Sequence, residues 1–163
     1  MIISNNLLGK LPVPDDAIIR VNLAWIKTLK EAKKIIKNSK HDIYLDYPSG
    51  RTKPPTPTLD IKDALELAKD KKVKYFALSN AEDLAVLENI KNQLNAIFVP
   101  KIETFEGVMN IPEMIEMGID HIMLDKEDLY IDCECDNAVY NTLLKNVRSH
   151  PIKIFELQGV IFI

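Results

Sequence analysis

The sequence predicts an α/β fold made of parallel βα repeats, because short apolar runs alternate with longer segments of helical periodicity. Its 163 residues suffice for one α/β domain, taken as residues 1–163, with a substantial core. Both a doubly wound sheet and a partial or incomplete TIM-type barrel fit this pattern. A complete barrel typically needs about 250 residues. A barrel of this length therefore lacks some of its repeats, or a partner supplies them.

Six apolar runs are the predicted strands, at residues 17–23, 42–47, 74–79, 96–103, 121–125 and 152–163, the last as one long strand or two short ones. Helices are predicted at residues 29–38, 61–70, 81–94, 111–118 and 137–150. Thr58 and Asp60 are suitable caps for the second helix, and Pro112 and Gly118 suit the start and end of the fourth. Residues 48–58 contain four of the nine prolines, which predicts a loop.

The composition is that of a soluble globular protein, with 47% hydrophobic and 28% charged residues. The net charge of −3 comes without a basic block, which argues against nucleic acid as a partner. No apolar run approaches the ~18 residues of a membrane span, so no membrane association is expected. The only cysteines, Cys133 and Cys135, lie in an acidic segment and are read as ordinary thiols in a reducing cytoplasm.

Polar residues recur where the predicted strands end. They are Arg20 and Asn22, then Asp46, then Ser79 and Asn80, then Lys101, Glu103 and Thr104, and finally Asp125, Glu127 and Asp128. Sites in parallel α/β folds lie at this edge of the sheet. Two carboxylates there could hold Mg²⁺ or Mn²⁺, while Arg and Lys bind a phosphate or carboxylate or stabilise an enolate. The alternative is a set of solvated ion pairs that contribute little.

Residues 101–129 resemble pyruvate kinase-like members of the phosphoenolpyruvate/pyruvate barrel superfamily. Lys101-Ile102-Glu103 matches a KIEN-type strand end, residues 107–110 match G-V-x-N, and residues 122–129 match a strand of the pattern I-M-V-A-R-G-D-L. The chain is also similar to 2-keto acid aldolases and the citrate lyase β subunit, through Glu127, Asp128 and Asp132. The similarity runs in order from about Ile18 to Leu129 and favours the incomplete TIM-type barrel.

The resemblance implies a metal-dependent protein that acts on phosphoenolpyruvate, pyruvate or a related 2-oxo acid, by phosphoryl transfer or enolate chemistry. Glu103 and Asp128 would hold Mg²⁺ or Mn²⁺, and Lys101 and Arg20 would be catalytic. The expected substrate-binding residues are Arg20, Asn22, Asp46 and Thr104. The resemblance also assigns a monovalent cation to Asn22 and Asp46.

Departures from the family pattern support an alternative, a degenerate and non-catalytic barrel fragment that binds a small anion or a partner protein. Glu127 and Tyr130 stand where the family has glycines, and only residues 48–58 stand where it has an inserted domain. Because a broken barrel exposes strand edges, a homo-oligomer is predicted.

Overall fold

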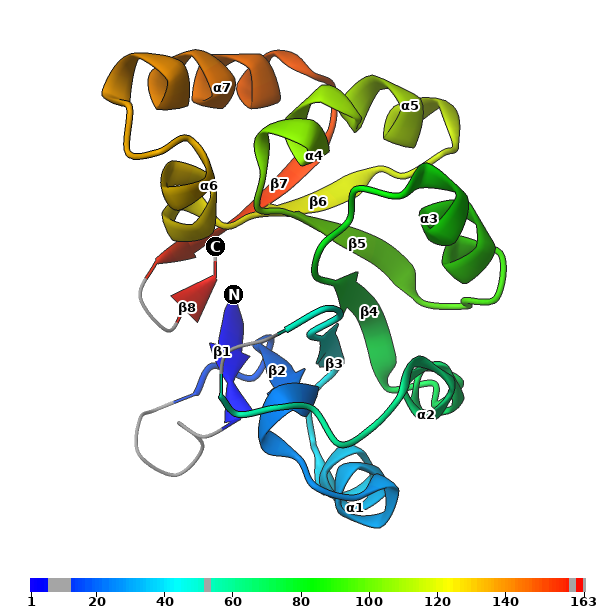
Figure 1. The fold of residues 1–163 in the computed structure, drawn as a ribbon. Coiled ribbons are helices and arrows are strands. Elements are labelled where there is room, and N and C mark those ends of the chain that lie inside the picture. The colour runs from blue at the N-terminus through cyan, green and yellow to red at the C-terminus, as the bar shows by residue number, and fades with distance from the viewer. Residues whose placement is uncertain (6–12, 52–53, 159–160, 163) are drawn as a thin grey trace.

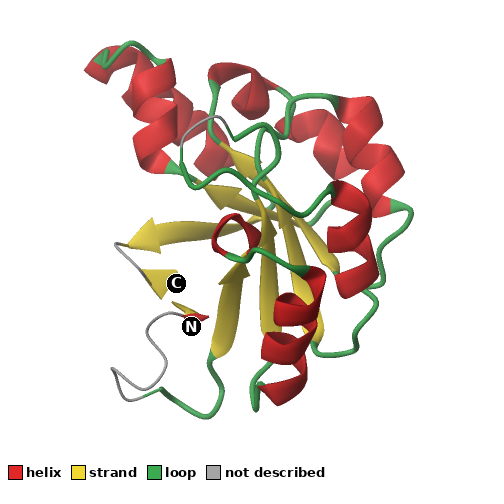
Figure 2. Cartoon of the chain, turned by 60° about the horizontal axis from the view of Figure 1, so that its bottom comes forward, coloured by secondary structure: helices red, strands yellow, loops and turns green. Residues whose placement is uncertain are grey.

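The computed structural model describes residues 1–5, 13–51, 54–158 and 161–162. The described strands curl into a barrel in sequence order, with helices on its outside (Figures 1 and 2). The strands are β1 (Ile2–Ser4), β2 (Ile18–Asn22), β3 (Ile43–Tyr47), β4 (Val73–Leu78), β5 (Ile97–Ile102), β6 (His121–Leu124), β7 (Lys153–Gln158) and β8 (Ile161–Phe162). The helices are η2 (Leu23–Trp25), α1 (Leu29–Asn38), α2 (Ile61–Leu67), α3 (Leu84–Lys91), α4 (Phe105–Met109), α5 (Ile111–Glu116), α6 (Lys126–Asp132) and α7 (Asn137–Ser149).

The predicted class, an α/β fold of parallel βα repeats in an incomplete TIM-type barrel, is confirmed. Strands β1 to β7 pair in parallel, each with the next. This is one parallel strand fewer than in a complete (β/α)₈ barrel. The two-residue β8 pairs antiparallel with both β7 and β1 and closes the ring. The strand edges on which the homo-oligomer prediction depended are therefore paired.

The local signals predicted most elements closely. Helix α1 has the predicted bounds and is capped by Thr28, whose hydroxyl accepts a hydrogen bond from Glu31 N. Helix α2 begins with a capping box between Asp60 and Asp63. The prediction missed β1, which has only three residues and shows no clear periodicity, whereas β7 and β8 match the expectation of two short strands within residues 152–163. Helices α4 and α6 were also missed, since each spans only one or two turns.

The inward face of the barrel is apolar at its base. Tyr44, Tyr75, His121 and Phe155 form an aromatic cluster whose ring centroids lie 5.4–6.0 Å apart. Ala77, Val99 and Met123 are buried with Tyr44 in the same inner cluster. The alternate strand residues, such as Ile19 and Leu45, face outward into the larger core beneath the helices. The barrel is therefore a packed core, and its floor supports whatever lies at the carboxyl ends of the strands.

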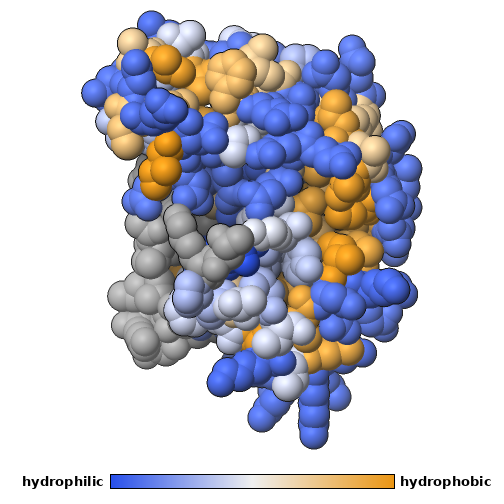
Figure 3. All heavy atoms as spheres, in the orientation of Figure 1, coloured by the Kyte–Doolittle hydropathy of each residue, from blue (hydrophilic) through white to orange (hydrophobic). Residues whose placement is uncertain are grey.

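The surface in view in Figure 3 is mostly hydrophilic, with apolar side chains gathered towards its upper part and along one side. Exposed large apolar residues include Phe105 and Met109 on α4 and Ile131 on α6. Among the described residues, no helix combines the length and apolar character that crossing a membrane requires.

Candidate functional site

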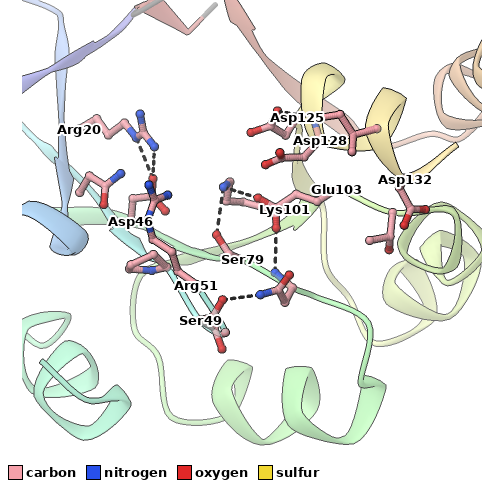
Figure 4. Close-up of a pocket in the computed structure, with 16 residues that line it drawn as sticks. Arg20, Asp46, Ser49, Arg51, Ser79, Lys101, Glu103, Asp125, Asp128 and Asp132 are labelled. Carbon is pink, nitrogen blue, oxygen red and sulfur yellow. Dashed lines mark hydrogen bonds and ion pairs between the residues drawn. The ribbon is translucent and has the colours of Figure 1, made fainter. Parts of the chain in front are cut away.

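A cavity of about 360 Å³ opens at the carboxyl ends of the strands. All seven residues predicted to form the site line it: Arg20, Asn22, Asp46, Lys101, Glu103, Thr104 and Asp128. They come from β2, β3, β5, the end of β5, and α6. The strand alternation explains the convergence, because Arg20, Asp46 and Lys101 occupy inward positions one layer above the apolar floor. Figure 4 shows these side chains around the cavity.

Arg20 and Asp46 form one ion pair of the cavity. The Arg20 Nε donates to Asp46 Oδ2 at 2.8 Å, and Arg20 Nη2 donates to the same oxygen. Asp46 is 1% exposed. Burial opposes its ionisation, but Arg20 and Lys101 outweigh that effect and hold the pKa of Asp46 below its usual value. Asp46 is thus a fixed carboxylate, and it holds the Arg20 guanidinium in the wall of the cavity.

Lys101 and Glu103 form a second buried pair in the middle of the cavity. The Lys101 Nζ lies 2.5 Å from Glu103 Oε1 and donates to Ser79 Oγ at 3.0 Å. Burial would lower the pKa of Lys101, but the carboxylates of Asp46 and Glu103 raise it. Lys101 is therefore an ammonium at neutral pH. Burial also raises the pKa of Glu103, and Lys101 and the Asn80 N–H only partly offset this.

Three carboxylates converge beside this pair. Ligand oxygens of Glu103, Asp125 and Asp128 all lie within 4.8 Å of one another. Glu103 is buried, Asp125 half-buried and Asp128 exposed, so the cluster runs from the cavity floor to its rim. Carboxylate oxygens at this spacing are the donor set that Mg²⁺ and Mn²⁺ prefer.

Asn22 and Thr104 both cap helices at the cavity wall. Asn22 Oδ1 accepts from Ala24 N at the start of η2. Thr104 Oγ1 accepts from Gly107 N at the start of α4 and donates to Glu82 Oε1 at 2.7 Å. These contacts hold both side chains in place at the cavity.

Sequence reasoning left several lining residues out of the predicted site. Asp125, Ser79 and Asn80 had been noted as polar residues at strand ends, which was a sufficient signal. Ser49 and Arg51 lie in the proline-rich loop, where no sequence periodicity indicates which way a side chain points. Asp132 also lines the cavity from the end of α6, and its Oδ2 accepts from Phe105 N at 2.7 Å.

The cavity lining carries more negative than positive charge. Five carboxylates and three cationic side chains line it, a formal balance of −2. The carboxylates are Asp46, Glu103, Asp125, Asp128 and Asp132, and the cations are Arg20, Arg51 and Lys101. One divalent cation would bring the formal charge of the lining to zero.

The departures at Glu127 and Tyr130 do not obstruct the cavity. Both residues lie on α6, at positions where the resembled family has a glycine-rich turn and where the Glu127 side chain was expected to crowd the site. Glu127 is exposed and does not line the cavity. The Tyr130 ring lies against Tyr140, with ring centroids 5.2 Å apart. Asp125 caps the helix by accepting from Asp128 N, so a helix start replaces the expected turn.

Comparison with known proteins supports the fold alone. No protein-family model matches the chain, and no curated protein matches it. A similar solved structure is a 3-dehydroquinate dehydratase from Geobacillus kaustophilus HTA426, with a TM-score of 0.53 and 9% sequence identity. The likeness covers 93% of this chain, and the chain spans 65% of the length of that protein.

These findings correct the family assignment made from the sequence. Membership of the pyruvate kinase-like, phosphoenolpyruvate/pyruvate superfamily was wrong, because no family model matches the chain and the structural likeness is to a dehydratase. The misleading motifs have a physical origin. Parallel barrels place lysines and carboxylates at strand ends whatever their chemistry, so three short matches in order do not identify a family.

Proposed function

We propose that this chain is an enzyme that binds Mg²⁺ or Mn²⁺ and uses it to stabilise the enolate of a small 2-oxo acid. The observation that carries the proposal is the convergence of Glu103, Asp125 and Asp128 ligand oxygens within 4.8 Å, next to the buried Lys101.

The acidic balance of the cavity supports a divalent metal. An anionic substrate would be repelled by a lining of formal charge −2, whereas a bound divalent ion brings that balance to zero. Glu103 Oε1 contacts Lys101 and Oε2 accepts from Asn80 N at 2.9 Å. Each carboxylate oxygen has a second lone pair, so Glu103 could coordinate a metal and keep these contacts.

Lys101 suits the stabilisation of an enolate. When a proton passes from the carbon next to an oxo group to solvent water, negative charge develops on the oxo oxygen. A metal and a fixed ammonium on that oxygen lower the energy of this charge, most strongly where water is excluded. The raised pKa of Lys101 keeps it cationic for this role. Arg20, which Asp46 holds in the wall, would face the substrate carboxylate.

Enolate chemistry is better supported than phosphoryl transfer. A cavity of about 360 Å³ is at the small end of the range of ligand sites, and it suits one small acid better than a nucleotide with a second substrate. A monovalent cation at Asn22 and Asp46 is not part of this proposal, because Arg20 already supplies a positive charge to Asp46.

Binding of a small anion without turnover is the second candidate. It is favoured by the short contact between Lys101 and Glu103, which satisfy each other without any ligand. The two candidates differ in one measurable step, the removal of a proton from the substrate carbon.

The first prediction tests metal binding and proton removal together. Mn²⁺ binding is measured by calorimetry, and exchange of the pyruvate methyl protons in D₂O with Mg²⁺ is followed by NMR. Glu103→Gln is expected to weaken Mn²⁺ binding at least about tenfold and to abolish exchange, because it removes the deepest proposed ligand. Lys101→Met is expected to keep Mn²⁺ binding and slow exchange about 10²-fold or more.

Glu106→Gln is the matched control, because Glu106 is an exposed acid on α4 that does not line the cavity. Unchanged Mn²⁺ binding by Glu103→Gln would contradict the metal site. Metal binding without proton exchange in any 2-oxo acid tried would leave only the binding function.

A further inference from the structure

We infer that the ligand of this cavity carries a second anionic group, a carboxylate or a phosphate, which binds at Arg51 on the loop of residues 48–51. The inference rests on the proposed function, because it places the metal-chelating end of the ligand at Glu103, Asp125 and Asp128. It narrows the substrate from any 2-oxo acid to one with an anionic group at each end.

The two ends of the cavity differ in the charge of their side chains. Arg20, Ser49 and Arg51 lie on one side of it, and Asp125, Asp128 and Asp132 lie on the other, with Lys101 between (Figure 4). A ligand whose one end chelates a metal has its other end directed towards the arginines. Arginine recognises carboxylate and phosphate through charge-assisted hydrogen bonds.

The loop that carries Arg51 is held in place from the cavity wall. Asn80 Nδ2 donates to Ser49 O at 2.5 Å. Gly50 has φ +65°, which glycine adopts more readily than other residues, and a Cβ there would lie 2.4 Å from the same Asn80 nitrogen, so the Asn80 side chain would have to shift. Arg51 Nη2 donates to Pro54 O at 3.0 Å. A loop ordered before binding costs less free energy when a ligand arrives.

The same asparagine connects the two ends of the cavity. Asn80 has φ 51°, and its backbone N donates to Glu103 Oε2 at 2.9 Å while its side chain holds the loop. Arg51 also lies close enough to Asp46 to help lower the pKa of Asp46. The loop is therefore positioned relative to the proposed metal ligands, as a two-ended ligand requires.

The size of the cavity agrees with a ligand longer than pyruvate. A volume of about 360 Å³ falls within the ~300–1,000 Å³ of sites that enclose drug-sized ligands. A three-carbon acid would leave much of this volume to water, and with its one carboxylate at Arg20 it would bring no second anionic group to Arg51.

The test compares two five-carbon acids that differ only at the distal end, 2-oxoglutarate and 2-oxopentanoate, each titrated calorimetrically into the protein with saturating Mn²⁺. The wild-type protein is expected to bind 2-oxoglutarate at least about tenfold more tightly. Arg51→Gln should reduce this preference to about threefold or less, and Arg51→Lys should retain part of it. Lys30→Gln, which removes one positive charge from the exposed face of α1, should leave the preference unchanged.

Competition experiments then identify the preferred group. Stronger displacement of 2-oxoglutarate by inorganic phosphate than by acetate assigns a phosphate, and the reverse assigns a carboxylate. Equal affinity for the two acids, or a preference that survives Arg51→Gln, overturns the inference while Mn²⁺ binding leaves the proposed function standing. Absence of Mn²⁺ binding before any acid is added overturns both.

Discussion

Asp46 and Glu103 are buried carboxyl groups in one cavity whose pKa values shift in opposite directions. The pKa of Asp46 is lowered because Arg20 and Lys101 outweigh its burial. The pKa of Glu103 is raised because its burial outweighs Lys101 and the Asn80 N–H. The surroundings of Asp46 therefore favour its ionised form. The surroundings of Glu103 disfavour its ionised form, and a bound metal would offset that unfavourable free energy.

These shifts predict opposite contributions to stability as the pH changes. The stabilisation from Asp46 is present above the unfolded pKa of about 3.8 and is lost as the pH falls through its lower folded value. The stabilisation from protonated Glu103 is present below the unfolded pKa of about 4.5 and is lost as the pH rises through its higher folded value.

Replacing Asp46 with Asn is predicted to destabilise the protein by roughly 3 kcal/mol at pH 7, because it removes the buried carboxylate that pairs with the half-buried Arg20. Urea unfolding measures the difference, which should shrink as the pH falls below about 3.8, since the unfolded chain then binds a proton at Asp46 that the folded protein does not. Asp42→Asn is the control. Asp42 forms an exposed ion pair with Lys74 at 3.6 Å, and its loss should cost less than about 1 kcal/mol. A loss at Asp46 that is independent of pH would contradict this account.

Among the helices, α6 begins after Asp125, a residue that has two functions. Asp125 caps the helix by accepting from Asp128 N, and it also contributes an oxygen to the carboxylate cluster. Short helices depend on such caps, because most of the backbone N–H groups of α6 lie in its first turn. The sequence marked Asp125 as a strand-end residue but did not predict α6, since seven residues show little periodicity.

The two functions of Asp125 can be separated by substitution. Asn and Asp cap helices equally well, so Asp125→Asn is predicted to keep the free energy of unfolding within about 0.5 kcal/mol. It should nonetheless weaken Mn²⁺ binding about tenfold or more, because an amide oxygen lacks the negative charge. Asp125→Ala should lose Mn²⁺ affinity and also about 1 kcal/mol of stability. Calorimetry and urea unfolding give the two quantities; unchanged Mn²⁺ affinity in Asp125→Asn would exclude Asp125 as a ligand.

For the whole molecule, closure of the barrel changes the basis of the homo-oligomer prediction. With β8 paired to both β1 and β7, unpaired edges no longer support it. Exposed apolar side chains now support the homo-oligomer prediction. Phe105 and Met109 lie four residues apart on one face of α4 and are 51% and 50% exposed.

Sedimentation equilibrium is predicted to give about twice the chain mass of 18.6 kDa at micromolar concentration. Met109→Lys should shift the mass to that of the monomer, because it places a charge in the apolar face. Val86→Lys, on the exposed side of α3, is the control and should leave the mass unchanged. A wild-type protein that sediments as a monomer would exclude the oligomer.

The sequence by itself determined the fold class, most of the strands with the polar residues at their ends, and seven residues that line the cavity. The strands and their polar ends follow from local periodicity and from the rule that carboxyl ends of parallel strands meet, and the family resemblance selected the seven among those polar residues. Only the tertiary structure decided how the barrel closes, that Asp125 joins Glu103 and Asp128, and that Asn80 holds the Arg51 loop. Those features depend on contacts between residues far apart in the chain, and two short strands or one loop asparagine leave no local pattern that predicts them.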